Sequence, residues 1–280
     1  MTERTIVNKG VARREDNHDL ITRIPPVTMS GPTPFLLIVH HGPQVYPPNN
    51  HGLPFAPHPH RGFETITFVR TGALLHEDSR SSPRIVHGGG VQWMTAGSGI
   101  VHNESAPPAF RKDGGPLEVL HLWLNLPSAL KAAPPHYVGL EAEDIPSIEI
   151  DGGRATVNVV AGRFEDTMAP IRSLTDATML VVDLAPGGTV VLPAPEGRSL
   201  FLYVIEGDVI IGGERVEQYS RVMFGDMGDR VTVTSTDGGT IIYGHAPPIN
   251  ESVAARGPFV MTTATELVQA ARDYQAGLFA

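Results

Sequence analysis

The chain has 280 residues and a formal net charge of −9 at pH 7. This length is enough for two domains, each with a hydrophobic core of its own. The charge and the absence of any basic run argue against direct binding to nucleic acid or to an anionic membrane, because both need clustered Lys and Arg. The polar start lacks the apolar core of a signal peptide, and no apolar run is long enough to span a membrane, so we expect a cytoplasmic protein.

Cysteine is absent from the chain. Disulfides, thiolate nucleophiles and Cys-ligated metal sites are therefore excluded, and histidine is the neutral nitrogen ligand that remains. Glycine (30 residues) and proline (25 residues) are spread along the whole chain, where they separate short apolar runs. This pattern is typical of an all-β sandwich or barrel.

The first half of the chain begins with an extended lead-in, residues 1–30, in which we identify no chemistry. After it come apolar segments of strand length, in which side chains on the two faces alternate with a period of two residues. We predict strands at 34–41, 61–70, 74–78, 84–87, 91–95, 100–104 and 117–126. The last of them is the strongest candidate, and it carries on one face Val119, His121, Trp123 and Asn125.

A Pro-rich connector at 127–146, with a single helical turn expected at 141–144, is the best candidate for a domain boundary. We therefore expect an N-terminal domain at 1–130, a linker at 131–146 and a C-terminal domain at 147–280.

The second half shows the same alternation, which predicts strands at 155–160, 178–184, 189–192, 199–205, 209–211, 231–233 and 240–243. Each half contains a strand that ends in a turn, at 68–72 and at 203–207, and this similarity suggests a duplication. In the second half, residues 195–199 occupy the place before the strand where the first half has its His pair, and they contain no histidine. The only histidine of the second half is His245. We therefore expect no metal in the C-terminal domain.

The end of the chain is predicted to form a short helix. Thr263 and Glu266 fit a capping box, and one helical face carries Leu267, Ala271, Tyr274 and Leu278. We interpret this helix as one that packs back on the domain.

Two pairs of residues indicate a metal site. Because residues two apart on a strand point the same way, His58 converges with His60, and His102 converges with Glu104. If the two strands are neighbours, three imidazoles and a carboxylate meet. This set suits iron(II), manganese, nickel, copper or zinc, and it leaves coordination positions open, as an oxygenase needs. Glu64, four residues after His60, is either a further ligand or a hydrogen-bonding group behind the ligands.

Other histidines have simpler interpretations. His40 and His41 close the first predicted strand and are expected to hydrogen-bond locally, whereas His76 and His87 flank a polar loop and are interpreted as surface groups. For His121, on a strongly apolar strand, a satisfied core residue is the default and a cavity wall is the alternative.

The sequence also resembles a known family. The spacing Gly52-x5-His58-x-His60-x3-Glu64 matches the first cupin motif, although the closing Gly72 comes one residue late. Four blocks together are similar to the pirin family, over nearly the whole chain: His58-Pro-His-Arg-Gly-Phe-Glu-Thr65, Gln92-Trp-Met-Thr-Ala-Gly97 with Gly99-Ile-Val-His102, Leu122-Trp-Leu-Asn-Leu-Pro127 and Gly257-Pro-Phe-Val-Met261.

This resemblance implies a bicupin, with two β-barrel domains face to face and one metal, usually iron, in the N-terminal barrel. The ligands that it implies are His58, His60, His102 and Glu104, with Glu64 outside the ligand set. The sequence differs from the family at two positions: His121 replaces a common Gln, and Ser105 replaces a common Met. Both differences change the expected cavity wall.

Two functions follow from the resemblance. The first is a quercetin 2,3-dioxygenase, which cleaves a flavonol or a similar small aromatic substrate with dioxygen, and in which Glu104 accepts the hydroxyl proton. The second is an iron-dependent regulator, in which the oxidation state of the metal changes the surface around Arg61 and Arg70 and so the affinity for a transcription factor or a metabolic enzyme. A cavity large enough for a three-ring flavonol would favour the first, and a closed pocket beneath a charged surface would favour the second.

Overall fold

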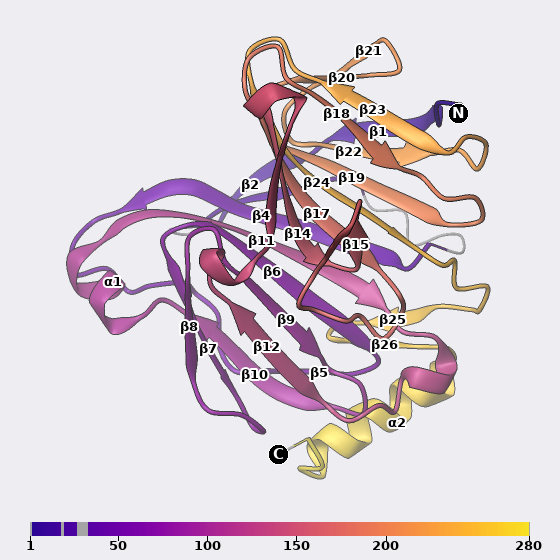
Figure 1. The fold of residues 1–280 in the computed structure, drawn as a ribbon. Helices are drawn as coiled ribbons and strands as arrows, with labels where there is room; N and C mark the ends of the chain where they lie inside the picture. Colours follow the sequence, from indigo (N-terminus) through magenta and orange to yellow (C-terminus); the bar gives the residue numbers. More distant parts are fainter. Residues whose placement is uncertain (1, 18–19, 27–32, 280) are drawn as a thin grey trace. The chain divides into compact units, whose positions relative to one another are not determined.

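The computed structural model describes residues 2–17, 20–26 and 33–279, and most of its regular structure is β-sheet (Figure 1). The prediction of an all-β protein with a C-terminal helix is confirmed. Of the predicted extended lead-in, residues 18–19 and 27–30 lie outside the described residues, and most of the remainder forms three strands.

The chain divides into two compact units, and neither is continuous in sequence. The N-terminal unit comprises Arg14–Ile24, Phe35–Glu143 and Ile249–Ala280, and the C-terminal unit comprises Met1–Arg13, Pro25–Pro34 and Asp144–Pro248. Each unit thus includes a segment from the opposite end of the chain. Strand pairing between distant segments decides which ends pack together, and the expected domain boundaries at 1–130, 131–146 and 147–280 stay a prediction.

The N-terminal unit contains two larger sheets and both α-helices. Its seven-stranded sheet has the order β12 (His136–Leu140), β9 (Val91–Thr95), β6 (Phe63–Thr71), β11 (Gly115–Asn125), β4 (Phe35–Tyr46), β3 (Leu20–Ile24) and β2 (Arg13–Asn17). Its four-stranded sheet has the order β5 (His58–His60), β10 (Ile100–Ser105), β7 (Ala73–Asp78) and β8 (Arg84–His87). The remaining elements are the hairpin β25 (Ala254–Arg256) and β26 (Phe259–Met261), the helices α1 (Pro108–Asp113) and α2 (Ala264–Gln275), and the 3-10 turns η1 (Ser128–Leu130) and η2 (Ala142–Asp144).

The C-terminal unit repeats this architecture. Its seven-stranded sheet has the order β1 (Ile6–Val11), β22 (Ser220–Phe224), β19 (Ser199–Glu206), β24 (Gly239–Ala246), β17 (Thr178–Leu184), β14 (Ala155–Ala161) and β13 (Ser147–Ile150). Its four-stranded sheet has the order β18 (Thr189–Pro193), β23 (Arg230–Thr234), β20 (Val209–Ile211) and β21 (Glu214–Val216), and the unit also contains β15 (Arg163–Phe164), β16 (Thr167–Met168) and the 3-10 turn η3 (Asp151–Gly153).

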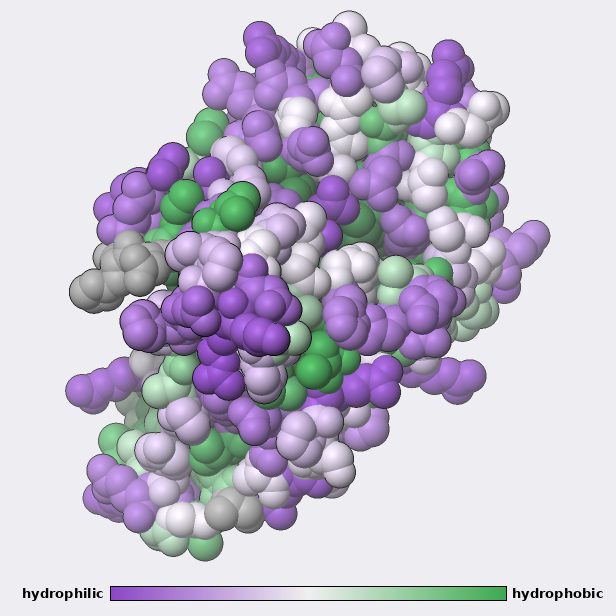
Figure 2. Space-filling model, turned by 90° about the vertical axis from the view of Figure 1, so that its left-hand side faces the viewer, coloured by the Kyte–Doolittle hydropathy of each residue, from purple (hydrophilic) through white to green (hydrophobic). Residues whose placement is uncertain are grey.

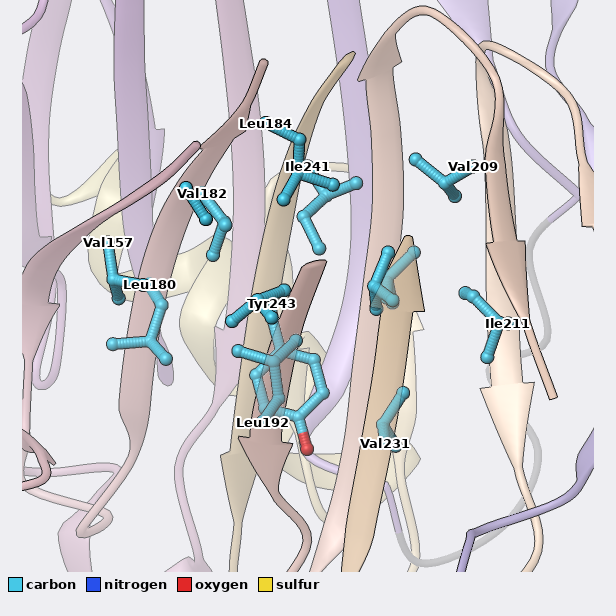
Figure 3. Close-up of a cluster of buried hydrophobic side chains, with 14 of the residues drawn as sticks. Val157, Leu180, Val182, Leu184, Leu192, Val209, Ile211, Val231, Ile241 and Tyr243 are labelled. Carbon is cyan, nitrogen blue, oxygen red and sulfur yellow. The ribbon is translucent and has the colours of Figure 1, made fainter. Parts of the chain in front are cut away.

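Aliphatic side chains fill the interior of the C-terminal unit. Alternate residues of its strands contribute to one buried cluster, which includes Val157, Leu180, Val182, Leu192, Ile211 and Ile241 (Figure 3). Tyr243 is fully buried in the same cluster, and its hydroxyl donates a hydrogen bond to the Pro193 carbonyl at 2.8 Å. This bond joins β24 of one sheet to β18 of the other.

The predicted strands agree with the observed ones apart from shifts at their ends. The largest shift is in β4, which continues to Tyr46, whereas the sequence suggested an end at His41. Several short strands were not predicted, among them β12, β13 and the hairpin β25–β26, because two to five residues give too little alternation to recognise.

The C-terminal helix begins with the predicted capping box. The Thr263 hydroxyl accepts a hydrogen bond from the Glu266 amide, and the Glu266 carboxylate accepts one from the Thr263 amide. The predicted apolar face is only partly correct, because Leu278 lies beyond the helix and is 63% exposed, while Ala270 is buried. Neither this helix nor any other in the described parts of the chain has the length and hydropathy needed to cross a membrane.

Hydrophilic residues predominate on the face shown in Figure 2, and hydrophobic residues appear there in small separate groups. Exposed large hydrophobic residues are correspondingly scattered, for example Val45, Met168 and Met227. Such single residues are usual on protein surfaces.

The buried hydroxyl of Tyr243 provides a test of how the two sheets of the C-terminal unit are joined. We expect Tyr243→Phe to lower the free energy of unfolding by about 1–2 kcal/mol, because it leaves the Pro193 carbonyl without this donor. Urea-induced unfolding measures the effect. Tyr274→Phe is the matched control, since Tyr274 is 40% exposed, and equal stabilities of the two variants would contradict the expectation.

Candidate metal centre

The two predicted ligand pairs lie on neighbouring strands. β5 and β10 pair antiparallel, with His102 directly opposite His58 and Ile100 opposite His60. Ligand nitrogens of His58, His60 and His102 all lie within 4.8 Å of one another. Among the described residues, these three histidines are the one group of three or more His, Asp or Glu side chains close enough together to hold a metal ion.

Backbone carbonyls orient two of these three imidazoles. The Nδ1 of His58 lies 2.8 Å from the Ala56 carbonyl, and the Nδ1 of His60 lies 3.2 Å from the Pro258 carbonyl. A carbonyl only accepts, so each Nδ1 carries the proton and each Nε2 has a free lone pair. The Nε2 atoms of His58 and His102 are 3.1 Å apart, a separation that needs a proton or a cation to relieve the repulsion of two lone pairs. These residues therefore fit a metal ion.

Burial keeps the imidazoles of His60 and His102 uncharged. It lowers the pKa of His60 to about 3, with a smaller contribution from His58, and it lowers the pKa of His102 well below its ordinary value. A neutral imidazole is the form that binds a metal. At neutral pH the site therefore presents nitrogen lone pairs without first losing protons.

Glu104 faces the same interior but is held by two other side chains. Its Oε1 accepts a hydrogen bond of 2.8 Å from the Thr67 hydroxyl, and its Oε2 lies 3.3 Å from the Nδ1 of His121. Burial raises the pKa of the Glu104 carboxyl, and the Thr67 hydrogen bond opposes this shift. Its carboxylate is not part of the compact group formed by the three histidines, so its role as the fourth ligand stays a prediction.

Glu64 does not lie where the spacing suggested. The chain breaks its strand geometry at Gly62, where φ is +86°, so the alternation of β5 does not continue into β6. In β6, Thr65 and Thr67 face the cavity, and Glu64 is on the opposite face, where it accepts a hydrogen bond of 2.7 Å from the Thr95 hydroxyl. A regular strand from His60 onward, which would place Glu64 on the face of the histidines, is therefore not formed.

A cavity of about 310 Å³ lies beside the histidines, and all its lining residues belong to the N-terminal unit. Most of the rest of the wall is apolar, with Leu37, Val39, Phe55 and Trp123, and the polar groups come from His41, His58, His60, Thr65, Glu104 and His121. The strand register places these side chains in rows across three neighbouring strands. His121 of β11 lies between Val39 of β4 and Thr67 of β6. Trp123 of β11 lies between Leu37 of β4 and Thr65 of β6. The volume is at the lower end of the range for small-molecule sites.

Two histidines for which the sequence predicted no role in the site, His41 and His76, have side chains that face the interior of this unit. His41 lies within β4 and not at its end, lines the cavity, and contacts the Thr22 hydroxyl through Nδ1 at 3.1 Å. The prediction that His76 is a surface group was wrong, because its side chain is 1% exposed and hydrogen-bonds to Asp78. It lies opposite Glu104 in the β10–β7 ladder and so faces inward.

Of the remaining two histidines, His87 agrees with expectation, whereas the Nε2 of His40 bonds to a neighbouring strand. His87 is exposed, as predicted, and contacts Glu141. His40 is fully buried and bonds through Nε2 to Glu118 at 2.9 Å, so its partner is on the neighbouring strand β11 and not in the local turn.

The C-terminal segment supports the strand that carries His60. The Val260 amide donates to the Arg61 carbonyl at 3.0 Å, next to the Pro258 carbonyl that orients His60. Arg61 also forms an ion pair with Asp273 of α2. In Figure 1 this segment is the yellow end of the chain. Sequence alone could not indicate the contact, because some 200 residues separate its two sides.

The buried side chain of Lys131 bonds to the segment that follows His60, to β11 and to the C-terminal hairpin. It is 5% exposed, and its ammonium donates to the Gly62 carbonyl, the Asn125 side chain and the Val260 carbonyl at 2.7–3.0 Å. Burial lowers its pKa to about 8, so the group still carries its proton at neutral pH.

We expect Lys131→Met to destabilise the protein by about 2–4 kcal/mol, because several buried oxygens lose their donor. Thermal or urea unfolding measures the loss. Lys112→Met, at an exposed lysine, should change stability by less than about 0.5 kcal/mol. If both variants unfold at the same midpoint, Lys131 does not hold these segments together.

We expect His60→Ala to weaken metal binding by more than about 100-fold, since loss of a group behind the ligands alone costs about 10–100-fold. Metal content after dialysis, measured by elemental analysis, tests this. His51→Ala changes an exposed histidine in a loop and should retain the metal. A His60→Ala protein that keeps its full metal content would rule out the ligand assignment.

Known proteins resemble the chain over most of its length. Residues 14–124 match the family described as pirin, and residues 179–280 match the pirin C-terminal cupin domain. A Pseudomonas aeruginosa protein named "putative quercetin 2,3-dioxygenase" is 34% identical over 247 residues, which cover 88% of this chain and 86% of that protein.

Solved structures share the fold. A quercetin 2,3-dioxygenase from Acinetobacter baumannii has a TM-score of 0.94 and 29% identity, over 99% of both chains. A bacterial pirin from Escherichia coli, solved in complex with nickel(II), has a TM-score of 0.68 and 18% identity over 86% of this chain and 99% of that one. The chain therefore belongs to the pirin family and has the N- and C-terminal cupin domains of a bicupin.

Proposed function

We propose that the protein is a metal-dependent dioxygenase of the quercetin 2,3-dioxygenase type, acting on a flavonol or a similar small aromatic substrate. The observation that carries this proposal is the position of three converging imidazoles at the wall of a largely apolar cavity that also contains a buried carboxylate. The names of the relatives at about one-third identity support the same reaction class.

In the proposed site His58, His60, His102 and Glu104 hold one divalent metal, for which we expect iron(II), with manganese, nickel, copper or zinc as alternatives. When bound by these residues, such a metal would supply Lewis-acid chemistry toward oxygen donors.

The protein's own residues prepare the substrate. Leu37, Phe55 and Trp123 provide apolar surface against which aromatic rings pack. A carboxylate oxygen of Glu104 accepts the proton of the substrate hydroxyl that is directed toward the metal. The largely apolar wall would strengthen the attraction between the resulting oxyanion and a metal bound by these residues.

The alternative, an iron-dependent regulator, depends on surface changes around Arg61 and Arg70. Arg61 is tied to Asp273 and stacks on the Phe279 ring, with its guanidinium carbon 5.5 Å from the ring centroid. These contacts connect the residue after His60 to the C-terminal helix. The open cavity beside the histidines nevertheless favours a small-molecule substrate over a protein partner as the first hypothesis.

The decisive experiment supplies quercetin to the protein reconstituted with iron(II) and measures oxygen consumption together with carbon monoxide release. We expect turnover by the native protein and a decrease of more than about 1,000-fold for His60→Ala, because the metal is central to the reaction.

His51→Ala should retain activity and serves as the matched control. No turnover by the native protein with iron fully bound would exclude the quercetin reaction and direct attention to the regulator.

A further inference from the structure

We propose that His121 is a substrate-binding residue whose Nε2 accepts a hydrogen bond from a hydroxyl of the aromatic substrate, a hydroxyl separate from the oxygen atoms that face the metal. The proposal rests on the proposed function and specifies its substrate class: aromatic compounds with an additional free hydroxyl group. The hydrogen bonds of His121, and its place in the cavity, carry the argument.

The network around Glu104 determines which nitrogen of His121 bears the proton. Thr67 has a single hydroxyl proton, which it donates to Glu104 Oε1 at 2.8 Å. In its 3.1 Å contact with His121 Nδ1, the Thr67 oxygen must therefore accept. Glu104 Oε2, at 3.3 Å from the same nitrogen, is a second acceptor. Nδ1 is thus a donor, and in the neutral ring Nε2 is left with a lone pair.

That lone pair has no partner of its own. His121 Nε2 is buried and makes no hydrogen bond to any described residue, whereas the side chain as a whole lines the cavity. Burial lowers the pKa of His121 to about 4, which is consistent with a neutral ring. An acceptor without a partner in a buried wall is costly unless a ligand supplies a donor.

The surroundings of His121 favour a hydroxyl on an aromatic ring. Phe55 and His41 lie edge-on to the His121 ring, with centroid separations of 6.1 and 5.3 Å. Trp123, two residues along β11, continues the same wall. A flat apolar molecule with a hydroxyl at its edge matches this wall, whereas a methyl ether at that position has no proton to donate. The histidine thereby selects among otherwise similar aromatic compounds.

Equilibrium binding to the iron(II)-loaded protein without oxygen tests this inference. The probes are quercetin and 3-hydroxyflavone, which share the metal-directed oxygen pair, while only quercetin has further hydroxyls. His121→Phe keeps a flat ring and removes both nitrogens. His121→Asn keeps an amide donor near the position of Nδ1 and has no group at the position of Nε2.

We expect the native protein to prefer quercetin, and this preference to fall by about three- to tenfold in both variants, the worth of one hydrogen bond. Metal content, measured in each sample, shows that the site is intact. An unchanged preference in both variants, with metal and binding retained, would overturn the inference and leave the proposed function standing.

A loss of preference in His121→Phe alone would show that His121 acts only by holding Glu104, and it would also overturn the inference. Failure of the native protein to bind either flavonol would instead contradict the proposed function itself.

Discussion

The antiparallel pairing of β5 with β10 is the constraint on which the rest of the site depends. It places His102 opposite His58 and brings His60 to the same face. β5 has only three residues, which is too short to hold its own position. Its orientation is therefore set by neighbours: the Pro258 carbonyl at His60, the Val260 amide at Arg61, and the ammonium of Lys131 at Gly62.

The low polarity of the interior of the N-terminal unit controls the protonation of its ionisable side chains. Burial disfavours charge on the imidazoles of His60 and His102 and on the Glu104 carboxyl alike. The consequences differ: the histidines are kept in the form that binds a metal, while the carboxylate needs the Thr67 hydroxyl and the His121 ring to stabilise it. The C-terminal unit shows the contrast, because aliphatic residues fill the equivalent interior there.

The comparison of sequence with structure separates local from non-local information. The period of two in the sequence predicted the long strands and which side chains share a face, including the face of β11 that carries His121 and Trp123. Spacing predicted the pairs His58 with His60 and His102 with Glu104. Spacing could not place Glu64, because the positive φ of Gly62 ends one strand before the next begins. The prediction failed for His76, since a polar loop nearby says nothing about which face the preceding strand turns inward.

The sequence by itself determined the family, the all-β fold and the residues able to bind a metal, because these follow from side-chain chemistry and from a period of two along one strand. Only the tertiary structure decided that residues 249–279 support the N-terminal unit, that His41 and His121 line one cavity, and that Nε2 of His121 is left without a partner. Those features arise where segments far apart in the chain meet, and no local pattern specifies which segments will meet.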